Sequence, residues 1–458
     1  MMNRHFKQLK TTILMLVCLT IAITGCHRSA PPRSLLIITL DTLRADHLGC
    51  YGNPLIHTPN LDRLAQQGHQ WSQAMCQTPL TVPSHAAIFT SRTTWDLRVL
   101  ANTNSLPETE TTLAEHLKRQ GFSTAGFTSG ILMFPRGLEQ GLDHIKLRKS
   151  GAQSGPVTTM LRKPGETAVT EDKMHPSAKK LVDEAIGWLD GHRTDRSMVW
   201  LHCFDPHMPY NPAPPIRNLY ASEGPIDDEA VKRLENPLAK DYPPEDLARI
   251  RQLYAAEVAY LDQHVGRLIR SVRSGKHPPL IVVVADHGEM FLDEHGYTGH
   301  GSSLHAQEIH IPLIMNDRAD EANTGLHPEV VESIDIVPTL LAWMKLPPMP
   351  TAEGRDLRAA KGNGSQTPMA RFCRRGFESG VMRNDFKLIH DLAGQQWESF
   401  DLAQDPQEKS PERVPDETMT GEMAEEAAAV RAIDAKNHGS DDLLDSDLQD
   451  ALKALGYL

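Results

Sequence analysis

The chain has 458 residues, of which 40% are hydrophobic and 23% are charged. This composition is that of a globular protein and excludes disordered, collagen-like and many-pass membrane chains. The formal net charge of -12 argues against general nucleic-acid binding, because contacts to phosphates demand a basic surface. Any anionic substrate must therefore be held by local positive charge.

The N-terminus has the pattern of an export signal. Three basic residues precede an apolar run over 11–23, which is shorter than the roughly 20 residues that span a bilayer. The tetrapeptide that ends at Cys26 resembles the lipobox of bacterial lipoproteins, whose cysteine becomes the lipid-bearing first residue. We expect a signal peptide over 1–25, a tether over 26–33, and a protein anchored by lipid on the periplasmic side of a bacterial membrane or on the cell surface. An uncleaved anchor helix is the alternative.

Strands and helices alternate over 34–345. The apolar runs Ser34–Leu40 and Leu280–Ala285 have strand length and are apolar on both faces, which indicates buried, parallel strands. Further strands are expected near Ser123–Thr128, Ser197–Cys203 and Ile311–Met315, and helices near Pro59–Gln67, Val82–Thr90, Glu110–Gln120, Ala178–Asp190 and Leu247–Arg270. The alternation predicts an α/β fold with a doubly wound, mostly parallel sheet.

Other parts of the chain are predicted to be loops, a linker and a small second domain. The polar stretches Gly151–His175 and Pro206–Asp246 have the length of functional loops. A helical segment at Pro328–Met344 is followed by a linker over 346–370 that is rich in Pro and Gly. The C-terminal α+β subdomain over 371–458 is expected to contain an antiparallel sheet with strands at Arg371–Phe377, Val381–His390 and Trp397–Leu402, and a terminal helix at Asp445–Ala454. We predict no disulfide.

Candidate metal ligands follow two of the predicted strands. Asp41 comes directly after the first strand, and Asp286 and His287 come directly after the strand Leu280–Ala285. In open α/β sheets the usual ligand site is the crevice beyond the carboxyl ends of the strands. Two carboxylates and an imidazole suit a divalent cation. A helix cap or a turn is the alternative for either aspartate alone.

A candidate nucleophile lies at the start of a helix. Thr81 precedes Pro83 and an apolar helical segment, so it has the position of a helix cap. The N-terminus of a helix also favours negative charge, which would stabilise an alkoxide on Thr81 and an anionic ester beside it. Both interpretations stay open from this segment alone.

Histidines gather in the loops that leave the same predicted sheet edge. His202 and His207 flank the end of the strand Ser197–Cys203, and His295, His300 and His305 occupy a Gly-rich loop after His287. His207 and His300 each have a position from which an imidazole could protonate a leaving group or bind an oxyanion. The alternative is that each of these histidines belongs to the core or the surface, with its hydrogen bonds made within the protein or to water and with no catalytic role.

These residues belong to motifs that resemble those of the sulfatases, within the alkaline-phosphatase-like superfamily, over residues 35–458. The motifs, in chain order, are Asp41-Thr42-Leu43-Arg44-Ala45-Asp46, Gly49-Cys50-Tyr51-Gly52, Thr58-Pro59-Asn60-Leu61-Asp62, Pro83-Ser84-His85, Phe204-Asp205-Pro206-His207, Asp286-His287-Gly288-Glu289, Glu294-His295-Gly296, Gly299-His300-Gly301 and Leu455-Gly456-Tyr457-Leu458. Their order over nearly the whole chain makes the resemblance specific. It implies a large α/β catalytic domain and a smaller C-terminal domain.

The resemblance also implies roles for single residues. It implies a metal ion held by Asp41, Asp286 and His287, with the nucleophile at Thr81, which would also contact the ion. It places His207 on the catalytic histidine of the family and His300 where many sulfatases carry a substrate-binding lysine. The candidate substrate-binding residues are Arg44, His85 and His305.

Thr81 departs from the pattern of the family. The sulfatase nucleophile is usually a Cys or Ser that is converted to formylglycine, and the β-methyl group of Thr81 prevents that conversion. No formylglycine is therefore expected. A threonine can attack an ester directly, as in phosphodiesterases of the wider superfamily.

Two further departures concern the ligands. His85 replaces the arginine of the nucleophile motif, and Thr42 stands where many sulfatases place a second metal-binding aspartate, so Thr42 is a further candidate ligand. One divalent ion is expected, Ca²⁺ by family and Zn²⁺ or Mn²⁺ as the alternative, because fewer carboxylates and an imidazole favour transition metals.

The sequence therefore predicts an exported, metal-dependent hydrolase of small anionic esters or of sulfated or phosphorylated glycans, with no nucleic-acid partner. The resemblance to the sulfatases implies sulfate esters as substrates, whereas a threonine nucleophile at position 81 favours phosphate esters. A phosphodiesterase or phospho-alcohol transferase, and a non-catalytic lipoprotein that binds sulfated or phosphorylated glycans, are the alternatives.

Overall fold

The computed structural model describes residues 34–129, 136–148, 178–192, 196–212, 214–222, 224–234, 243–275, 277–291, 298–318, 324–359, 369–374, 378–391 and 396–412, with residues 421, 425 and 428. The predicted signal peptide with Cys26, the loop Gly151–His175 and the terminal helix Asp445–Ala454 lie outside the described residues.

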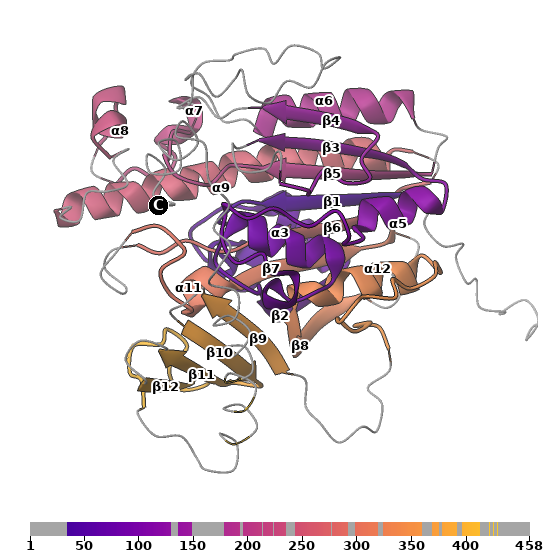
Figure 1. Ribbon diagram of the computed structural model, residues 1–458. Coiled ribbons are helices and arrows are strands. Elements are labelled where there is room, and N and C mark those ends of the chain that lie inside the picture. The colour runs from indigo at the N-terminus through magenta and orange to yellow at the C-terminus, as the bar shows by residue number, and fades with distance from the viewer. Residues whose placement is uncertain are drawn as a thin grey trace, which may run out of the picture. The chain divides into compact units, whose positions relative to one another are not determined.

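An eight-stranded sheet forms the centre of the described chain, in the order β4-β3-β5-β1-β6-β7-β2-β8 (Figure 1). The strands are β1 (Leu35–Leu40), β2 (His69–Met75), β3 (Ser123–Ser129), β4 (His144–Arg148), β5 (Ser197–Cys203), β6 (Leu280–Ala285), β7 (His310–Asn316) and β8 (Gly325–Glu332). β1 is parallel to both of its neighbours, β5 and β6, whereas β7 is antiparallel to β6 and β2. The prediction of a mostly parallel α/β sheet is confirmed.

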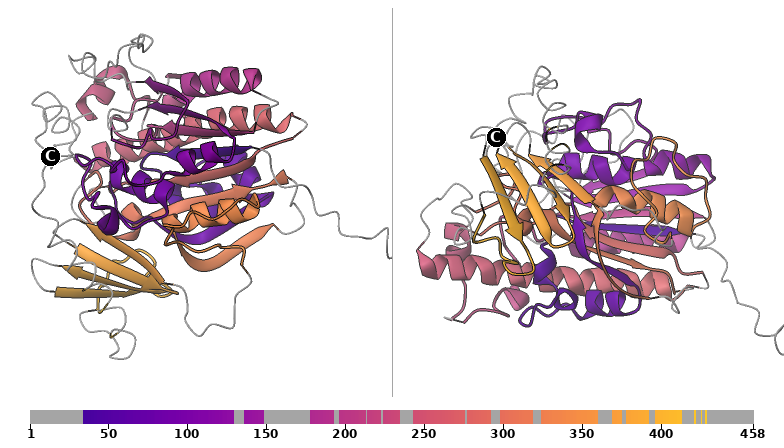
Figure 2. Two further views of the ribbon diagram at one scale, coloured as in Figure 1. Left: turned by 45° about the vertical axis from the view of Figure 1, so that its right-hand side comes forward. Right: turned by 90° about the horizontal axis from the view of Figure 1, so that it is seen from below.

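Helices cover both faces of this sheet (Figures 1 and 2). The helices are α2 (Pro59–Gln66), α3 (Thr81–Thr90), α4 (Thr94–Leu97), α5 (Leu113–Arg119), α6 (Ala178–Gly191), α7 (Pro214–Arg217), α8 (Asp228–Leu234), α9 (Pro244–Arg273), α11 (Ala306–Ile309) and α12 (Ile336–Trp343), with the 3₁₀ turns η1 (Ala45–His47), η2 (Gly49–Tyr51) and η6 (Ser333–Asp335). The long helix α9 packs against α2 and α6 on one face, and α3, α5 and α12 lie on the other. This sandwich buries β1 and β6 completely, so the residues that follow them start from a rigid support.

The C-terminal part contains a four-stranded antiparallel sheet in the order β12-β11-β10-β9. Its strands are β9 (Met369–Arg374), β10 (Glu378–Arg383), β11 (Phe386–Asp391) and β12 (Gln396–Asp401). The prediction of a small antiparallel sheet is confirmed. β9 contacts the segment that follows β2 directly, because the backbone N–H of Cys373 donates to the carbonyl of Gln77 across 2.9 Å.

Several element predictions were wrong in detail. The segment Pro328–Met344 is not one helix: β8 runs to Glu332 and α12 begins only at Ile336. The predicted strand Val381–His390 is a hairpin, because Asn384 turns the chain with a left-handed φ of 53°, which asparagine tolerates. The region Pro206–Asp246 contains α7 and α8 rather than only loops.

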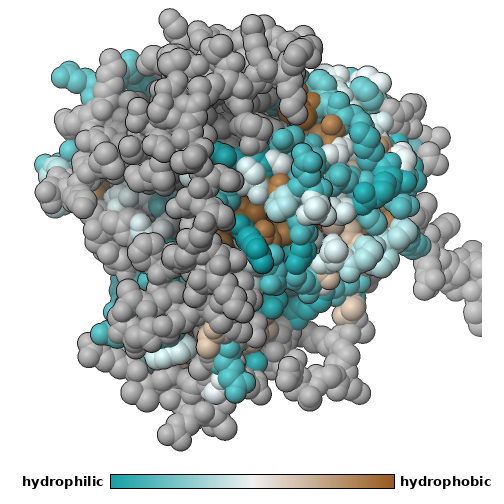
Figure 3. Space-filling model, in the orientation of Figure 1, coloured by the Kyte–Doolittle hydropathy of each residue, from teal (hydrophilic) through white to brown (hydrophobic). Residues whose placement is uncertain are grey.

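No helix among the described residues is long and apolar enough to cross a bilayer. On the face shown in Figure 3, the described side chains are mostly hydrophilic, and hydrophobic ones form small separate groups. Cys50, Cys76, Cys203 and Cys373 are free thiols.

Candidate active site

Asp41 and Asp286 lie side by side because the strands before them are paired. β1 and β6 run parallel in a register that places Leu40 opposite Ala285, so both chains deliver the next residue to the same edge of the sheet. The Asp41 and Asp286 residues are 1% and 0% exposed. The predicted convergence of the two strand ends is therefore present in the structure.

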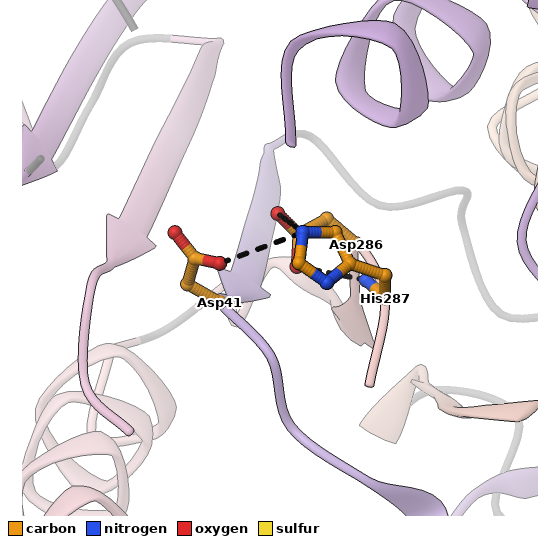
Figure 4. Close-up of side chains that lie close together, drawn as sticks. All are labelled: Asp41, Asp286 and His287. Atoms are coloured by element: carbon orange, nitrogen blue, oxygen red, sulfur yellow. Dashed lines mark hydrogen bonds and ion pairs between the residues drawn. The ribbon is translucent and has the colours of Figure 1, made fainter. Parts of the chain in front are cut away.

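His287 completes the group (Figure 4). Its ring Nδ1 lies 3.0 Å from the carbonyl of Gly288, which requires an N–H donor, so the neutral ring keeps an unprotonated Nε2. That Nε2 lies 3.8 Å from Asp41 Oδ1 and 3.6 Å from Asp286 Oδ2. The ligand atoms of the three residues all lie within 4.8 Å of one another.

Burial and the charges of the neighbouring side chains dominate the electrostatics of this group. Burial raises the pKa of Asp41 well above its usual range, and the neighbouring Asp286 carboxylate raises it further. Burial opposes ionisation of Asp286 as well, but His287 and other imidazoles outweigh it and lower the pKa of Asp286. Burial opposes protonation of His287, yet the two carboxylates leave its pKa raised. A cation would relieve the repulsion between the carboxylates.

The orphaned atoms of this group fit a divalent cation. Asp41 Oδ1 and Asp286 Oδ2 are buried and accept no hydrogen bond from any part of the chain that the structure describes. Burying a carboxylate oxygen without a partner costs free energy, so such atoms are normally paired with a donor or coordinate a metal. Carboxylate oxygens and an imidazole nitrogen are suitable donors for Zn²⁺, Mn²⁺ or Ca²⁺. That these residues hold an ion stays a prediction.

Thr81 lies at the same place and does not act as a helix cap. It is the first residue of α3, whose N-cap is Leu80, and no side chain caps the helix. The Thr81 Oγ1 atom lies 3.2 Å from His287 Nε2. Behind it, the backbone N–H of Val82 donates to Asn102 Oδ1 across 2.9 Å. The threonine hydroxyl therefore faces the candidate cation site.

Thr42 turns the chain sharply after Asp41. Its backbone has a left-handed φ of 53°, which is rare for a β-branched residue. Its N–H donates to Asp286 Oδ1 across 3.2 Å, which ties the two strand ends together. Its Oγ1 is buried and has no hydrogen-bond partner among the described residues. A ligand role for Thr42 stays a prediction.

The imidazole rings of His207 and His300 lie beside this group. The ring centroid of His300 is 4.5 Å from that of His287 and 4.9 Å from that of His207. The Nδ1 of His207 lies 2.5 Å from the carbonyl of Met208, so Nδ1 carries the proton in the neutral ring. Burial and the nearby His300 lower the pKa of His207 to about 3. Both rings are therefore neutral bases at rest, because burial, and then His287, also lowers the pKa of His300.

Each of the three candidate substrate-binding residues forms hydrogen bonds with other residues of the protein. His85 is completely buried under Thr81, with Nδ1 2.8 Å from the Thr81 carbonyl. The Arg44 guanidinium donates to Asp46 and to the Glu289 carbonyl. His305 lies 2.9 Å from a Glu408 carboxylate oxygen. Their roles in binding substrate stay predictions.

Three residues that contribute hydrogen bonds or side chains to this region were given no role from the sequence. Glu289 lies in the motif after His287 and bonds His300, but nothing local indicates that partner. His202 was noted without a role, although its position opposite Thr39 in the neighbouring strand follows from the register of β1 and β5. Asn102 comes from a loop that carries no recognisable pattern.

The comparisons with known proteins agree on one family. The sequence model of the family described as Sulfatase matches residues 33–346. Iduronate 2-sulfatase of Mus musculus is 26% identical over 388 residues, which cover 69% of each chain. N-acetylglucosamine-6-O-sulfatase of Bacteroides thetaiotaomicron is 21% identical over 468 residues, which cover 82% of this chain and 81% of that protein.

Solved structures share the fold. The phosphonate monoester hydrolase of Agrobacterium radiobacter matches with a TM-score of 0.69 at 22% identity, over 89% of this chain and 96% of that chain. A structure in complex with its substrate D-glucosamine-2-N,6-O-disulfate matches with the same TM-score of 0.69 at 19% identity, over 93% of this chain and 98% of that one. The eight-stranded sheet with a small C-terminal sheet is therefore shared with enzymes that differ in substrate.

Proposed function

The chain belongs to the sulfatase family and is an ester hydrolase of that family, and from this premise we propose that it is a metal-dependent hydrolase whose Thr81 attacks a phosphate ester directly. The observation that carries the proposal is the Thr81 Oγ1 atom, which faces His287 Nε2 at 3.2 Å in the candidate cation site. A β-branched residue there cannot become formylglycine, so we infer that the hydroxyl itself is the nucleophile.

The residues present divide the chemistry among them. Asp41, Asp286 and His287 would hold a divalent cation, which supplies positive charge that lowers the pKa of a nearby hydroxyl and neutralises an ester oxygen. The Thr81 hydroxyl gives its proton to the unprotonated ring of His207 or His300, and its oxygen forms a bond to phosphorus while the bond from phosphorus to the alcohol oxygen breaks. The imidazole that took up this proton passes it to the departing alcohol. The same imidazole then removes a proton from the water that attacks the phospho-threonine and gives it to the Thr81 oxygen as the bond from phosphorus to that oxygen breaks.

Sulfate esters are the second candidate. The curated relatives that match over most of their length are sulfatases, and one of them acts on N-acetylglucosamine 6-O-sulfate groups by name. The structure bound to a disulfated glucosamine supports a sulfated or phosphorylated glycan as the substrate class. The nucleophile favours phosphate, because a threonyl sulfate cannot be released by the elimination that formylglycine permits.

We place this enzyme on the outer face of a bacterial membrane, bound through lipid on Cys26. The proposal depends on the basic, apolar and Gly-Cys pattern of residues 4–26. Export of the full chain with Cys26→Ser is expected to yield the protein in the soluble fraction, whereas the natural sequence partitions with membranes.

A substrate panel tests the function. The purified protein is stripped with a chelator, reloaded with Zn²⁺, Mn²⁺ or Ca²⁺, and offered an aryl phosphate, an aryl phosphodiester and an aryl sulfate. We expect metal-dependent turnover that is faster on a phosphate ester than on the sulfate. Faster turnover of the sulfate would favour the second candidate. Binding of anionic glycans without turnover of any ester would favour the non-catalytic alternative, and transfer to an added alcohol would favour a transferase.

A further inference from the structure

The carboxylate of Glu308 holds the chain that follows His300. Glu308 lies in the short helix α11 and is completely buried. Its Oε2 accepts from the backbone N–H groups of Gly301 and Ser302, at 2.5 and 3.3 Å. Its Oε1 is buried and accepts no hydrogen bond from any residue that the structure describes. Burying that oxygen costs free energy, so the carboxylate contributes more to the position of the loop than to folding.

The main chain of Glu308 is itself fixed beside the candidate cation site. Its carbonyl accepts from the N–H of Gly288, the residue after His287, across 2.7 Å. A Cβ atom on Gly288 would lie 2.0 Å from the carbonyl oxygen of Gln307, so a glycine is needed for the two segments to approach this closely. The Glu308 side chain therefore reaches the chain after His300 from a support that also holds His287.

The two sides of His300 are held in different ways. On the N-terminal side, Gly299 and Met290 exchange two backbone hydrogen bonds, with N–O distances of 2.7 and 3.1 Å. On the C-terminal side, the backbone N–H groups turn to a side chain, that of Glu308. Hydrogen bonds from an N–H to a carboxylate are stronger than those to a neutral acceptor. A single substitution at Glu308 can therefore release one side of His300 and leave the other side intact.

The chain after His300 also packs against the residue that precedes the candidate nucleophile. Gly301 has a left-handed φ of 82°, which glycine adopts without strain. A Cβ atom on Gly301 would lie 3.0 Å from Leu80 Cδ2, and Leu80 comes directly before Thr81. A shift of Gly301 would therefore change how the His300 ring lies relative to the Thr81 hydroxyl.

We propose that Glu308 is a positioning residue for the reaction, which holds the backbone after His300 so that this imidazole can pass its proton to the departing alcohol. The proposal rests on the proposed function and deepens it, because it takes His300 rather than His207 as the imidazole that serves the leaving group. Glu289 bonds the His300 ring itself, at 3.0 Å, whereas Glu308 fixes the backbone that carries the ring. Glu308 therefore acts only through His300.

Two esters that differ in their leaving group test this role. The full chain is offered the phenyl ester and the 4-nitrophenyl ester of the acid group that it turns over faster, phosphate or sulfate. Phenolate is the more basic leaving group and needs the proton more. Glu308→Met keeps the volume of the side chain but removes its acceptor. We expect kcat/KM to fall about 100-fold on the phenyl ester, as for a misplaced catalytic group, and much less on the 4-nitrophenyl ester. Equal falls on both esters, or no fall on either, would overturn the proposal.

Further variants separate the position of the loop from folding. Glu308→Gln keeps an oxygen that can accept from both N–H groups, so it should restore most of the activity on the phenyl ester. A loss as large as that of Glu308→Met would overturn the proposal. If Glu308→Met does not fold, Glu308→Asp replaces it with the same expectation, because its shorter side chain withdraws the carboxylate from the two donors.

Asp262→Leu is the matched control. Asp262 is a buried carboxylate on α9 that also accepts from two successive backbone N–H groups, those of Asn60 and Leu61, at 3.1 and 2.8 Å. Its loss should change kcat/KM by the same factor on both esters. A selective fall on the phenyl ester in Asp262→Leu would show that the loss of any such carboxylate gives this signature, which would overturn the proposal.

A double-mutant cycle shows whether Glu308 acts through His300. In the His300→Ala background, adding Glu308→Met should change kcat/KM on the phenyl ester by less than about 2-fold. A further large fall would mean that Glu308 acts on another group, and would overturn the proposal. If the unaltered protein hydrolysed no ester, the proposed function would fail as well. If it hydrolysed both esters and Glu308→Met kept the same ratio between them, only the Glu308 proposal would fail.

Discussion

His300 Nδ1 lies 3.0 Å from Glu289 Oε1, and both residues are buried beside the candidate cation site. The second carboxylate oxygen of Glu289 accepts from the Tyr210 hydroxyl at 3.0 Å. Burial raises the pKa of Glu289 to about 7, against the opposing effect of nearby histidines. Because burial lowers the pKa of His300, the pair holds one shared proton near neutral pH. That proton is available to a leaving alcohol.

Replacing Glu289 by Gln tests this shared proton. The pair holds its proton below about pH 7 and loses it above, so activity that needs the proton should fall as the pH rises through about 7. Without the carboxylate, His300 alone loses its proton at a lower pH. Glu289→Gln should therefore shift the alkaline limb of the kcat profile to lower pH and reduce kcat by about 10–100-fold. An unshifted limb would contradict the assignment, and Glu329→Gln, which alters a partly buried glutamate on β8, is the control.

Substitution of Thr81 tests the direct nucleophile. Thr81→Ala should reduce kcat by at least about 10³-fold, because removing an attacking group leaves only the contribution of binding and electrostatics. Thr81→Ser keeps the hydroxyl and should retain measurable phosphatase activity. Steady-state kinetics on the best substrate of the panel measures both. Full activity in Thr81→Ala would show that the hydroxyl is not the nucleophile.

Neutralising one carboxylate should separate stability from metal binding. In the metal-free protein Asp41 and Asp286 lie close together and buried, so their mutual repulsion opposes folding. Asp41→Asn should therefore leave the melting temperature of the metal-free protein unchanged or raised. It should also abolish the rise in melting temperature that Zn²⁺ gives the unaltered protein. Thermal scans with and without the ion measure both effects, and a zinc-dependent rise retained in Asp41→Asn would refute the ligand role.

A buried ion pair between Lys387 and Glu408 lies where the chain around Glu408 contacts Ala306, just after the loop that contains His300. Lys387 Nζ donates to both oxygens of Glu408, at 2.8 and 3.1 Å, and the backbone N–H of Ala306 also donates to that carboxylate. Lys387 and Glu408 are each 1% exposed. Glu408→Gln leaves the lysine charge buried and unpaired, so we expect a loss of about 3–5 kcal/mol in the free energy of unfolding. Combining it with Lys387→Met should recover much of that loss.

The ion pair between Lys387 and Glu408 also predicts that the stability of the protein decreases at acidic pH. Burial opposes ionisation of Glu408, but Lys387 outweighs it and lowers the pKa to about 2, below the usual 4.5. The stabilisation is present above pH 4.5 and is lost as the pH falls toward 2. Urea titrations should show this loss in the unaltered protein and in Glu412→Gln, which alters an exposed side chain nearby, but not in Glu408→Gln. Parallel curves for all three would contradict the ion pair.

Much of the site follows from local sequence, and the rest depends on distant packing. Asp41 and Asp286 could be placed together because each follows a continuous apolar run, and such runs form adjacent parallel strands. The strand β2 and its neighbour at the edge of the sheet, β8, were not predicted, because their polar and histidine residues obscure the alternation that is typical of a strand. Glu289 and Glu408 could not be assigned, because the partners of both are fixed only by tertiary contacts over 11 and 103 residues of chain.

The measurement that tests the central claim most directly is a rapid quench of the zinc- or manganese-loaded protein during turnover of an aryl phosphate, followed by peptide mass spectrometry. The direct-attack mechanism predicts a phosphoryl group on Thr81 that appears before steady state, decays as water hydrolyses it, and is absent from Thr81→Ala. Turnover of the ester with no phosphoryl group on Thr81 at any time, and with activity retained in Thr81→Ala, would contradict it.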